Sequence, residues 1–145
     1  MTTIRVAQAT DAEAIARLCG ELGYPTTAVD VEVRRGAIEH SSEHRVFVTE
    51  VDGEVCGWLH ACVAHAMEYD RFGEIRGLVV DERARGRRVG AELVAAAERW
   101  VRTLGITQMR VRSRDSRERA HRFYEREGYE VVKKQLAFVK QLESG

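Results

Sequence analysis

One short stretch of the sequence combines glycines and arginines in a pattern that suits phosphate chemistry. A mostly apolar run over 75–80 is typical of a buried strand, and residues 85–90 then read Arg-Gly-Arg-Arg-Val-Gly before a helical pattern begins. Amides at a helix start have no acceptor within the helix, and the helix dipole adds partial positive charge there. Because glycine lets a ligand approach the backbone closely, the stretch predicts a phosphate or pyrophosphate site. An ordinary strand-to-helix connection with solvated arginines fits the same pattern.

Other reactive residue types give weaker signals. His60 and His65 are candidate bases, since an unperturbed histidine titrates near neutrality. Cys19, Cys56 and Cys62 are odd in number and lie among apolar residues, which favours reduced thiols. No C-x-x-C spacing is present and the cysteines do not cluster, so no metal site is expected. The sequence also has no G-x-S-x-G elbow and no P-loop lysine, which argues against a serine hydrolase or a nucleotidase.

Composition limits the class of protein further. A chain of 145 residues with 44% hydrophobic and 32% charged residues is typical of one globular domain. A formal net charge of zero argues against a nucleic-acid or anionic-membrane partner. No run approaches the roughly 20 apolar residues of a membrane span, and the N-terminus has no signal-peptide pattern. A cytoplasmic protein is therefore expected.

The first part of the chain predicts a strand, two helices and a hairpin. Thr10 and Glu13 have capping-box spacing, which predicts a helix that begins at Thr10 and ends at Gly23. A second helix is expected over 28–38, with Val29, Val33 and Ile38 as its inward positions. Asp52-Gly53 is a strong hairpin signal between two strand patterns. The strands are expected over 4–7, 45–51 and 54–65.

The rest of the chain alternates between strand and helix patterns. Strands are expected over 75–80, 106–111, 129–132 and 135–142, and helices over 90–104 and 117–127. A right-handed crossover would make strands 75–80 and 106–111 parallel. The order β-α-α-β-β-β-α-β-α-β-β predicts a single α+β domain over 1–145. Its central sheet would be mixed, mostly antiparallel and flanked by helices.

This order, together with two motifs, resembles the GNAT superfamily of acetyl-CoA-dependent N-acetyltransferases over residues 4–132. The first motif, [Q/R]-x-x-G-x-[G/A], falls on 85–90. The second, A-x-x-F-Y-x-x-x-G-[F/Y], falls on 120–129. One departure concerns the loop: Arg88 stands where the first motif has glycine, although Gly86 lies two residues earlier. Pyrophosphate binding is still expected, because the backbone amide of Arg88 is retained.

The resemblance implies a set of residues that bind acetyl-CoA. The strands over 75–80 and 106–111 would diverge, and the pantetheine arm would pair with Leu78, Val79 and Val80 in the gap. Ser113 and Ser116 would replace an asparagine that contacts the pantetheine in many relatives. The pyrophosphate would meet the backbone amides of the loop, which are those of Arg85, Gly86, Arg87, Arg88, Val89 and Gly90.

The resemblance also implies catalytic roles. Direct attack of a bound amine needs a neutral amine and a proton for the departing thiolate. Tyr124 occupies the general-acid position, and Glu74 is the candidate base, acting through a water. Each has a structural alternative: Tyr124 can pack beside Phe123, and Glu74 can pair with Arg76. His60 and His65 are rival bases.

The identity of the acceptor is less constrained. We expect a primary amine on a small molecule, attacked in a ternary complex without an acyl-enzyme. A protein or peptide amine is one alternative, and a non-catalytic acyl-CoA-binding regulatory module is another. The last predicted strand, over 135–142, can pair within the chain or with a second copy, and a homodimer is favoured.

Overall fold

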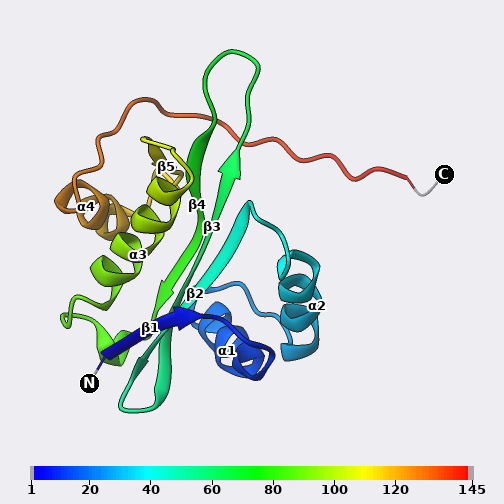
Figure 1. Ribbon diagram of the computed structural model, residues 1–145, viewed down its shortest axis with the longest axis vertical. Helices are drawn as coiled ribbons and strands as arrows, with labels where there is room; N and C mark the ends of the chain where they lie inside the picture. The colour runs from blue at the N-terminus through cyan, green and yellow to red at the C-terminus, as the bar shows by residue number, and fades with distance from the viewer. Residues whose placement is uncertain (1, 144–145) are drawn as a thin grey trace. The chain divides into compact units, whose positions relative to one another are not determined.

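A computed structural model describes residues 2–143 of the chain (Figure 1). The chain divides into two compact units, one up to Arg112 and one from Ser113 onward, and each is described by itself. The first unit contains a five-stranded sheet in the order β1-β2-β3-β4-β5. The first four strands are antiparallel neighbours, and the fifth runs parallel to the fourth, as the crossover predicts. The strands are β1 (Thr2–Val6), β2 (His44–Val51), β3 (Glu54–Ala64), β4 (Phe72–Val80) and β5 (Met109–Val111).

The hairpin between β2 and β3 forms as predicted. Asp52 and Gly53 have φ values of +52° and +83°, so both central residues occupy the left-handed region. A type I′ turn requires this conformation, and its twist matches that of the two strands. The turn aligns Val51 with Glu54 and thereby sets the register of the hairpin.

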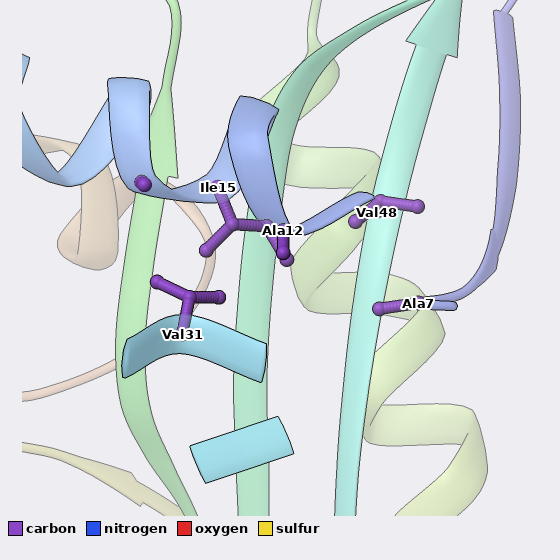
Figure 2. Close-up of a cluster of buried hydrophobic side chains, with 6 residues drawn as sticks. Ala7, Ala12, Ile15, Val31 and Val48 are labelled. Carbon is purple, nitrogen blue, oxygen red and sulfur yellow. The ribbon is translucent and has the colours of Figure 1, made fainter. Parts of the chain in front are cut away.

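Helices cover both faces of this sheet. Figure 1 shows α1 (Ala12–Leu22) and α2 (Ala28–Ile38) on one face and α3 (Val89–Thr103) on the other. Figure 2 shows how Ile15 of α1 and Val31 of α2 meet beneath the sheet, near Val48 of β2. Opposite them, Leu93 of α3 is fully buried. No helix within residues 2–143 is long and apolar enough to cross a membrane.

Two predictions about the helices are wrong in detail. The 3-10 turn η1 (Ala9–Asp11) precedes α1. The capping side chain is that of Asp11 rather than Thr10, and it accepts a hydrogen bond from the Gln8 amide at 2.7 Å. In α2 the buried positions are Val31 and Arg35, whereas Val29 and Val33 are exposed. Arg35 tolerates burial because Glu32 and Glu39 accept its hydrogen bonds at 2.6 and 3.1 Å.

Over residues 113–143, the second unit contains one helix, α4 (Glu118–Arg126), followed by Gly128 with φ +97°. The two strands predicted over 129–132 and 135–142 are wrong: the chain has no regular secondary structure over 129–143. An isolated two-stranded hairpin is marginal in water, and the Lys133-Lys134 pair between the two segments lacks a turn residue that favours positive φ. As a result, large apolar side chains of this tail are exposed, namely those of Val131, Val132, Leu136, Phe138, Val139 and Leu142.

Candidate active site

Strand β4 continues beyond the end of the short strand β5. They pair only at Gly73–Met109, Glu74–Arg110 and Ile75–Val111, whereas β4 stays paired with β3 as far as Val80. In the part of the chain that the structure describes, no strand pairs with the β5 side of residues 76–80. Alternate backbone groups in this segment therefore face a gap, where an extended ligand can supply their partners. β5 ends at Val111, where its pairing with β4 ends, so the predicted divergence takes the form of an unpaired edge of β4 that includes Leu78, Val79 and Val80.

The loop after β4 presents backbone amides at the start of α3. Within residues 2–143, the amides of Gly86, Arg88, Val89 and Gly90 have no backbone acceptor. Arg88 has φ +60° and Gly86 has φ +88°, so both lie in the left-handed region. The arginine thus adopts a backbone conformation that favours glycine, at a cost of about 1–2 kcal/mol. The side chain changes at this position, but the glycine-like backbone is kept.

A buried carboxylate holds the start of this loop. The side chain of Asp81 is 2% exposed, and it accepts hydrogen bonds from the Arg83 amide at 2.9 Å and from Arg17 Nη1 at 3.2 Å. The Arg83 guanidinium donates to it as well, at 2.9 Å. These contacts, the Arg83 side chain foremost, hold the pKa of Asp81 well below its usual range. Asp81 has no distinct signal in the sequence, because a lone aspartate after a strand is common.

Arg83 is therefore committed to Asp81 rather than available to a ligand. Arg85 lies 3.8 Å from Glu82, a loose surface pair. Arg87 and Arg88 have no acidic partner within 4 Å among the described residues. Of the loop arginines, these two are best placed to attract a polyanion.

Replacing Asp81 by Asn is expected to lower the free energy of unfolding by about 1–3 kcal/mol at pH 7, because the guanidinium groups lose their anion. The pKa of Asp81 is depressed in the folded protein, so its contribution is full above the ordinary value of 3.8 and fades as pH falls below it. Urea unfolding at pH 7 and at about pH 2.5, well below the ordinary pKa, measures this. The wild-type protein should lose more stability over that interval than the Asp81→Asn variant. Equal losses would contradict a structural role for the charge.

Glu74 lies where β4 and β5 are about to separate. A side chain on its neighbour Gly73 would meet Val101 of α3, so strand alternation turns Glu74 toward the opposite face. Glu74 is 8% exposed, and its carboxylate accepts hydrogen bonds from Arg76 at 2.6 Å and from Arg112 at 3.3 Å. The pairing with Arg76 is the expected structural alternative. The carboxylate is nonetheless buried beside the gap, where a base is needed.

The two histidines, His60 and His65, are less suited than Glu74 to act as the general base. His60 lies 3.0 Å from His44 between ring nitrogens, and burial, with His44 adding to it, lowers the pKa of His60 to about 4. His60 is therefore neutral near pH 7 and is a weak acceptor for a proton from an ammonium group. His65 is exposed and lies 2.7 Å from Glu43. Glu74 remains the better candidate.

Trp58 of β3 and Gly77 of β4 make a close contact beside this site that was not predicted from the sequence. The indole of Trp58 lies against Gly77, where an added Cβ would be 2.7 Å from the indole ring. The indole Nε1 is buried and has no hydrogen-bond partner among the described residues. A glycine inside a strand pattern is the available signal, because it often marks close approach of another group.

The second unit carries the other predicted residues. The Tyr124 ring packs edge-on against Phe123 and Tyr129, with centroids 5.1 and 5.8 Å away. Burial raises the pKa of Tyr124 to about 12, so the phenol stays protonated at neutral pH. Ser113 and Ser116 are exposed ahead of α4. The structure thus brings Glu74, the gap and the loop together in one unit, and the roles of Tyr124, Ser113 and Ser116 stay predictions.

A sheet of this order, with an unpaired edge of β4 beside a loop of free amides, is the arrangement that the resemblance to acetyl-CoA-dependent N-acetyltransferases predicts. Residues 10–129 match the acetyltransferase (GNAT) family, and the chain belongs to that family. The family predicted from the two motifs is confirmed, and with it the enzyme class and acetyl-CoA as co-substrate. Within residues 2–143, no group of three His, Cys, Asp or Glu is placed to hold a metal ion.

Three comparisons show the range of similar proteins. Aminoalkylphosphonate N-acetyltransferase of Salmonella typhimurium is 38% identical over 54% of this chain and 51% of its own length, so the match spans about half of that relative. An N-acetyltransferase of Chlorobaculum tepidum is 30% identical over 92% of this chain and 79% of its own. The structure of aminoglycoside N-acetyltransferase AAC(6')-Iy in complex with CoA covers 98% of this chain and 96% of its own. Its TM-score is 0.86 at 19% identity, which shows a shared fold.

Proposed function

We propose that the protein transfers the acetyl group of acetyl-CoA to a primary amine on a small molecule, by direct attack in a ternary complex. The divergence of β4 and β5 beside a buried carboxylate is the observation that carries this proposal. The pantetheine arm would enter the gap along Leu78–Val80. The pyrophosphate would bind the amides of residues 85–90, with Arg87 and Arg88 adding charge attraction.

The chemistry assigns one role to each residue. Glu74, through a water, takes a proton from the ammonium group so that the neutral amine can attack the thioester carbon. A β4 amide facing the gap donates to the carbonyl oxygen as negative charge develops. When the carbon–sulfur bond breaks, Tyr124 donates its phenolic proton to the thiolate. The products are the N-acetylated amine and free coenzyme A.

Two named similarities support a small acceptor. One relative is named for aminoalkylphosphonates and one structural neighbour for aminoglycosides, and both compounds are small amines. We therefore propose a small-molecule amine ahead of a protein or peptide amine.

We also propose a homodimer that uses the tail over 129–143. Its apolar side chains are 71–84% exposed at Val131, Val132, Leu136, Val139 and Leu142, and 88% at Phe138, which is costly unless a partner covers them. Sedimentation velocity should give a dimer for the full chain and a monomer for Phe138→Asp. A monomeric wild-type protein at micromolar concentration would count against the dimer.

The central test has two parts. Calorimetry should detect acetyl-CoA binding, and the absence of binding at high micromolar concentration would contradict the proposal. A thiol-release assay over an amine panel then separates an enzyme from a binding module. An enzyme releases free coenzyme A with at least one amine, whereas a regulatory module binds acetyl-CoA and releases none.

A further inference from the structure

Two guanidinium groups converge on the carboxylate of Glu74. Arg76 Nη1 lies 2.6 Å from one carboxylate oxygen, and Arg112 Nη2 lies 3.3 Å from the other. Arg76 belongs to β4, and Arg112 directly follows β5, so the pair spans the point where the strands separate. One carboxylate faces two arginines, which leaves an excess of one positive charge. A single buried carboxylate needs only one such partner.

Both arginines keep most of their hydrogen-bonding capacity. A guanidinium has five N–H donors, and each of these groups places one nitrogen on Glu74. The side chain of Arg76 is 48% exposed and that of Arg112 is 71% exposed. Neither has a second acidic partner within 4 Å in the described part of the chain. Their remaining donors are therefore open to a ligand that reaches Glu74.

A third arginine strengthens the positive charge on this edge of the sheet. Arg110 is the register partner of Glu74 on β5, so the two side chains share a face. Its guanidinium lies 4.4 Å from the ring centre of Tyr69 and 4.2 Å from that of Phe72, which holds it in place. Around the candidate base, the charge is thus positive on both strands.

We propose that the acceptor carries an anionic group, a carboxylate, phosphate or phosphonate, which Arg76 and Arg112 bind while the amine faces Glu74. This rests on the proposed function and names the class of its acceptor. Arginine forks match carboxylate and phosphate oxygens in a bidentate way, so two of them can fix a short anionic amine in one orientation. The same charges repel polycationic acceptors, and they favour the neutral form of the amine that must attack.

The alternative role of the arginines is to hold Glu74 alone. In that case their loss would change turnover of every amine by the same factor. Under the proposal, their loss weakens binding of anionic amines only. Matched acceptors that differ in one charge separate the two roles.

The experiment compares β-alanine with β-alaninamide, adds 2-aminoethylphosphonate and spermidine, and follows release of free coenzyme A. The wild-type protein should prefer β-alanine to its amide by about tenfold or more in kcat/KM, the usual size of one charge-assisted hydrogen bond. Arg76→Gln and Arg112→Gln should each remove about tenfold for the two anionic amines, mainly through KM. Both should lower kcat/KM for β-alaninamide by a smaller factor, so the ratio of the two acceptors is the quantity to compare. Arg76→Lys should restore part of the loss.

Arg99→Gln is the matched control, since Arg99 is an exposed arginine of α3 on the opposite face of the sheet. It should behave like the wild-type protein with every amine. The inference is overturned if β-alanine is no better than its amide, or if the Arg76 and Arg112 variants lower both equally. Coenzyme A release from β-alaninamide or spermidine alone overturns it while leaving the proposed function intact. Release from no amine at all overturns both.

Discussion

Replacing Tyr124 by Phe is expected to lower kcat by about 10²–10⁴-fold, the usual contribution of a positioned proton donor. The thiolate of coenzyme A is a poor leaving group unless it receives a proton as the carbon–sulfur bond breaks. Burial raises the pKa of Tyr124 to about 12, so the phenol carries its proton throughout the range in which the enzyme is assayed. Phenylalanine keeps the ring and its packing on Phe123, but it has no proton to donate.

Steady-state kinetics and calorimetry together check this expectation. Acetyl-CoA affinity should change little, because the hydroxyl acts on the departing thiolate rather than on the bound cofactor. Tyr129→Phe is the matched control, since it removes a hydroxyl from a ring that packs on Tyr124. If Tyr124→Phe turns over at the wild-type rate, Tyr124 is a packing residue and the general acid is another group.

The raised pKa of Tyr124 also predicts how kcat depends on pH in the alkaline range. A phenol with an ordinary pKa of 10 would begin to lose its proton above about pH 9. Because the pKa of Tyr124 is shifted upward, the wild-type rate should not fall between pH 8 and pH 10 through loss of this proton. A fall in kcat within that range would argue against Tyr124 as the donor.

Local signals in the sequence predict much of the first unit. The Asp52-Gly53 dipeptide favours one type of hairpin turn, and that turn sets the register of the two strands. The glycine-bearing loop at 85–90 indicates the start of α3 to within one residue. In each case the information lies within a few neighbouring residues, so the sequence carries it directly.

Features that depend on distant residues were harder to predict. In α2 the valine pattern suggests the wrong buried face, because Glu32 and Glu39 allow Arg35 to be buried instead of Val33. The tail over 135–142 alternates like a strand, yet alternation supplies no partner for its backbone groups.

In the candidate site, too, local features can be predicted from the sequence, whereas contacts between distant residues cannot. The position of Glu74 before an apolar run can be read from the sequence, but its contact with Arg112 joins residues 38 positions apart. The left-handed conformation of Arg88 was also hidden, since arginine rarely adopts it. Motif spacing therefore predicts where the chemistry takes place, whereas the charges around it come from the packing of β4 against β5.

Replacing Glu74 by Gln is expected to lower kcat by about 10²-fold or more at pH 7, because the amide cannot take a proton from the attacking ammonium. An alkylamine has a pKa near 10, so only about one molecule in a thousand is neutral at pH 7. Without a base, the rate should rise about tenfold for each unit of pH up to the pKa of the amine. The variant should therefore approach the wild-type rate at high pH.

Measured pH–rate profiles from pH 6 to pH 10 test this role, with thermal unfolding to verify that the variant is folded. Arg76→Gln is the informative partner variant, because it removes one contact of the carboxylate and keeps the base. If Glu74 is the base and Arg76 binds an anion, the two variants should affect different kinetic constants. Glu74→Gln lowers kcat without raising KM for β-alanine, since the arginines lose their competing carboxylate, whereas Arg76→Gln mainly raises that KM. Parallel pH profiles for Glu74→Gln and the wild-type protein would instead assign Glu74 to holding the arginines, and the base would have to be sought elsewhere.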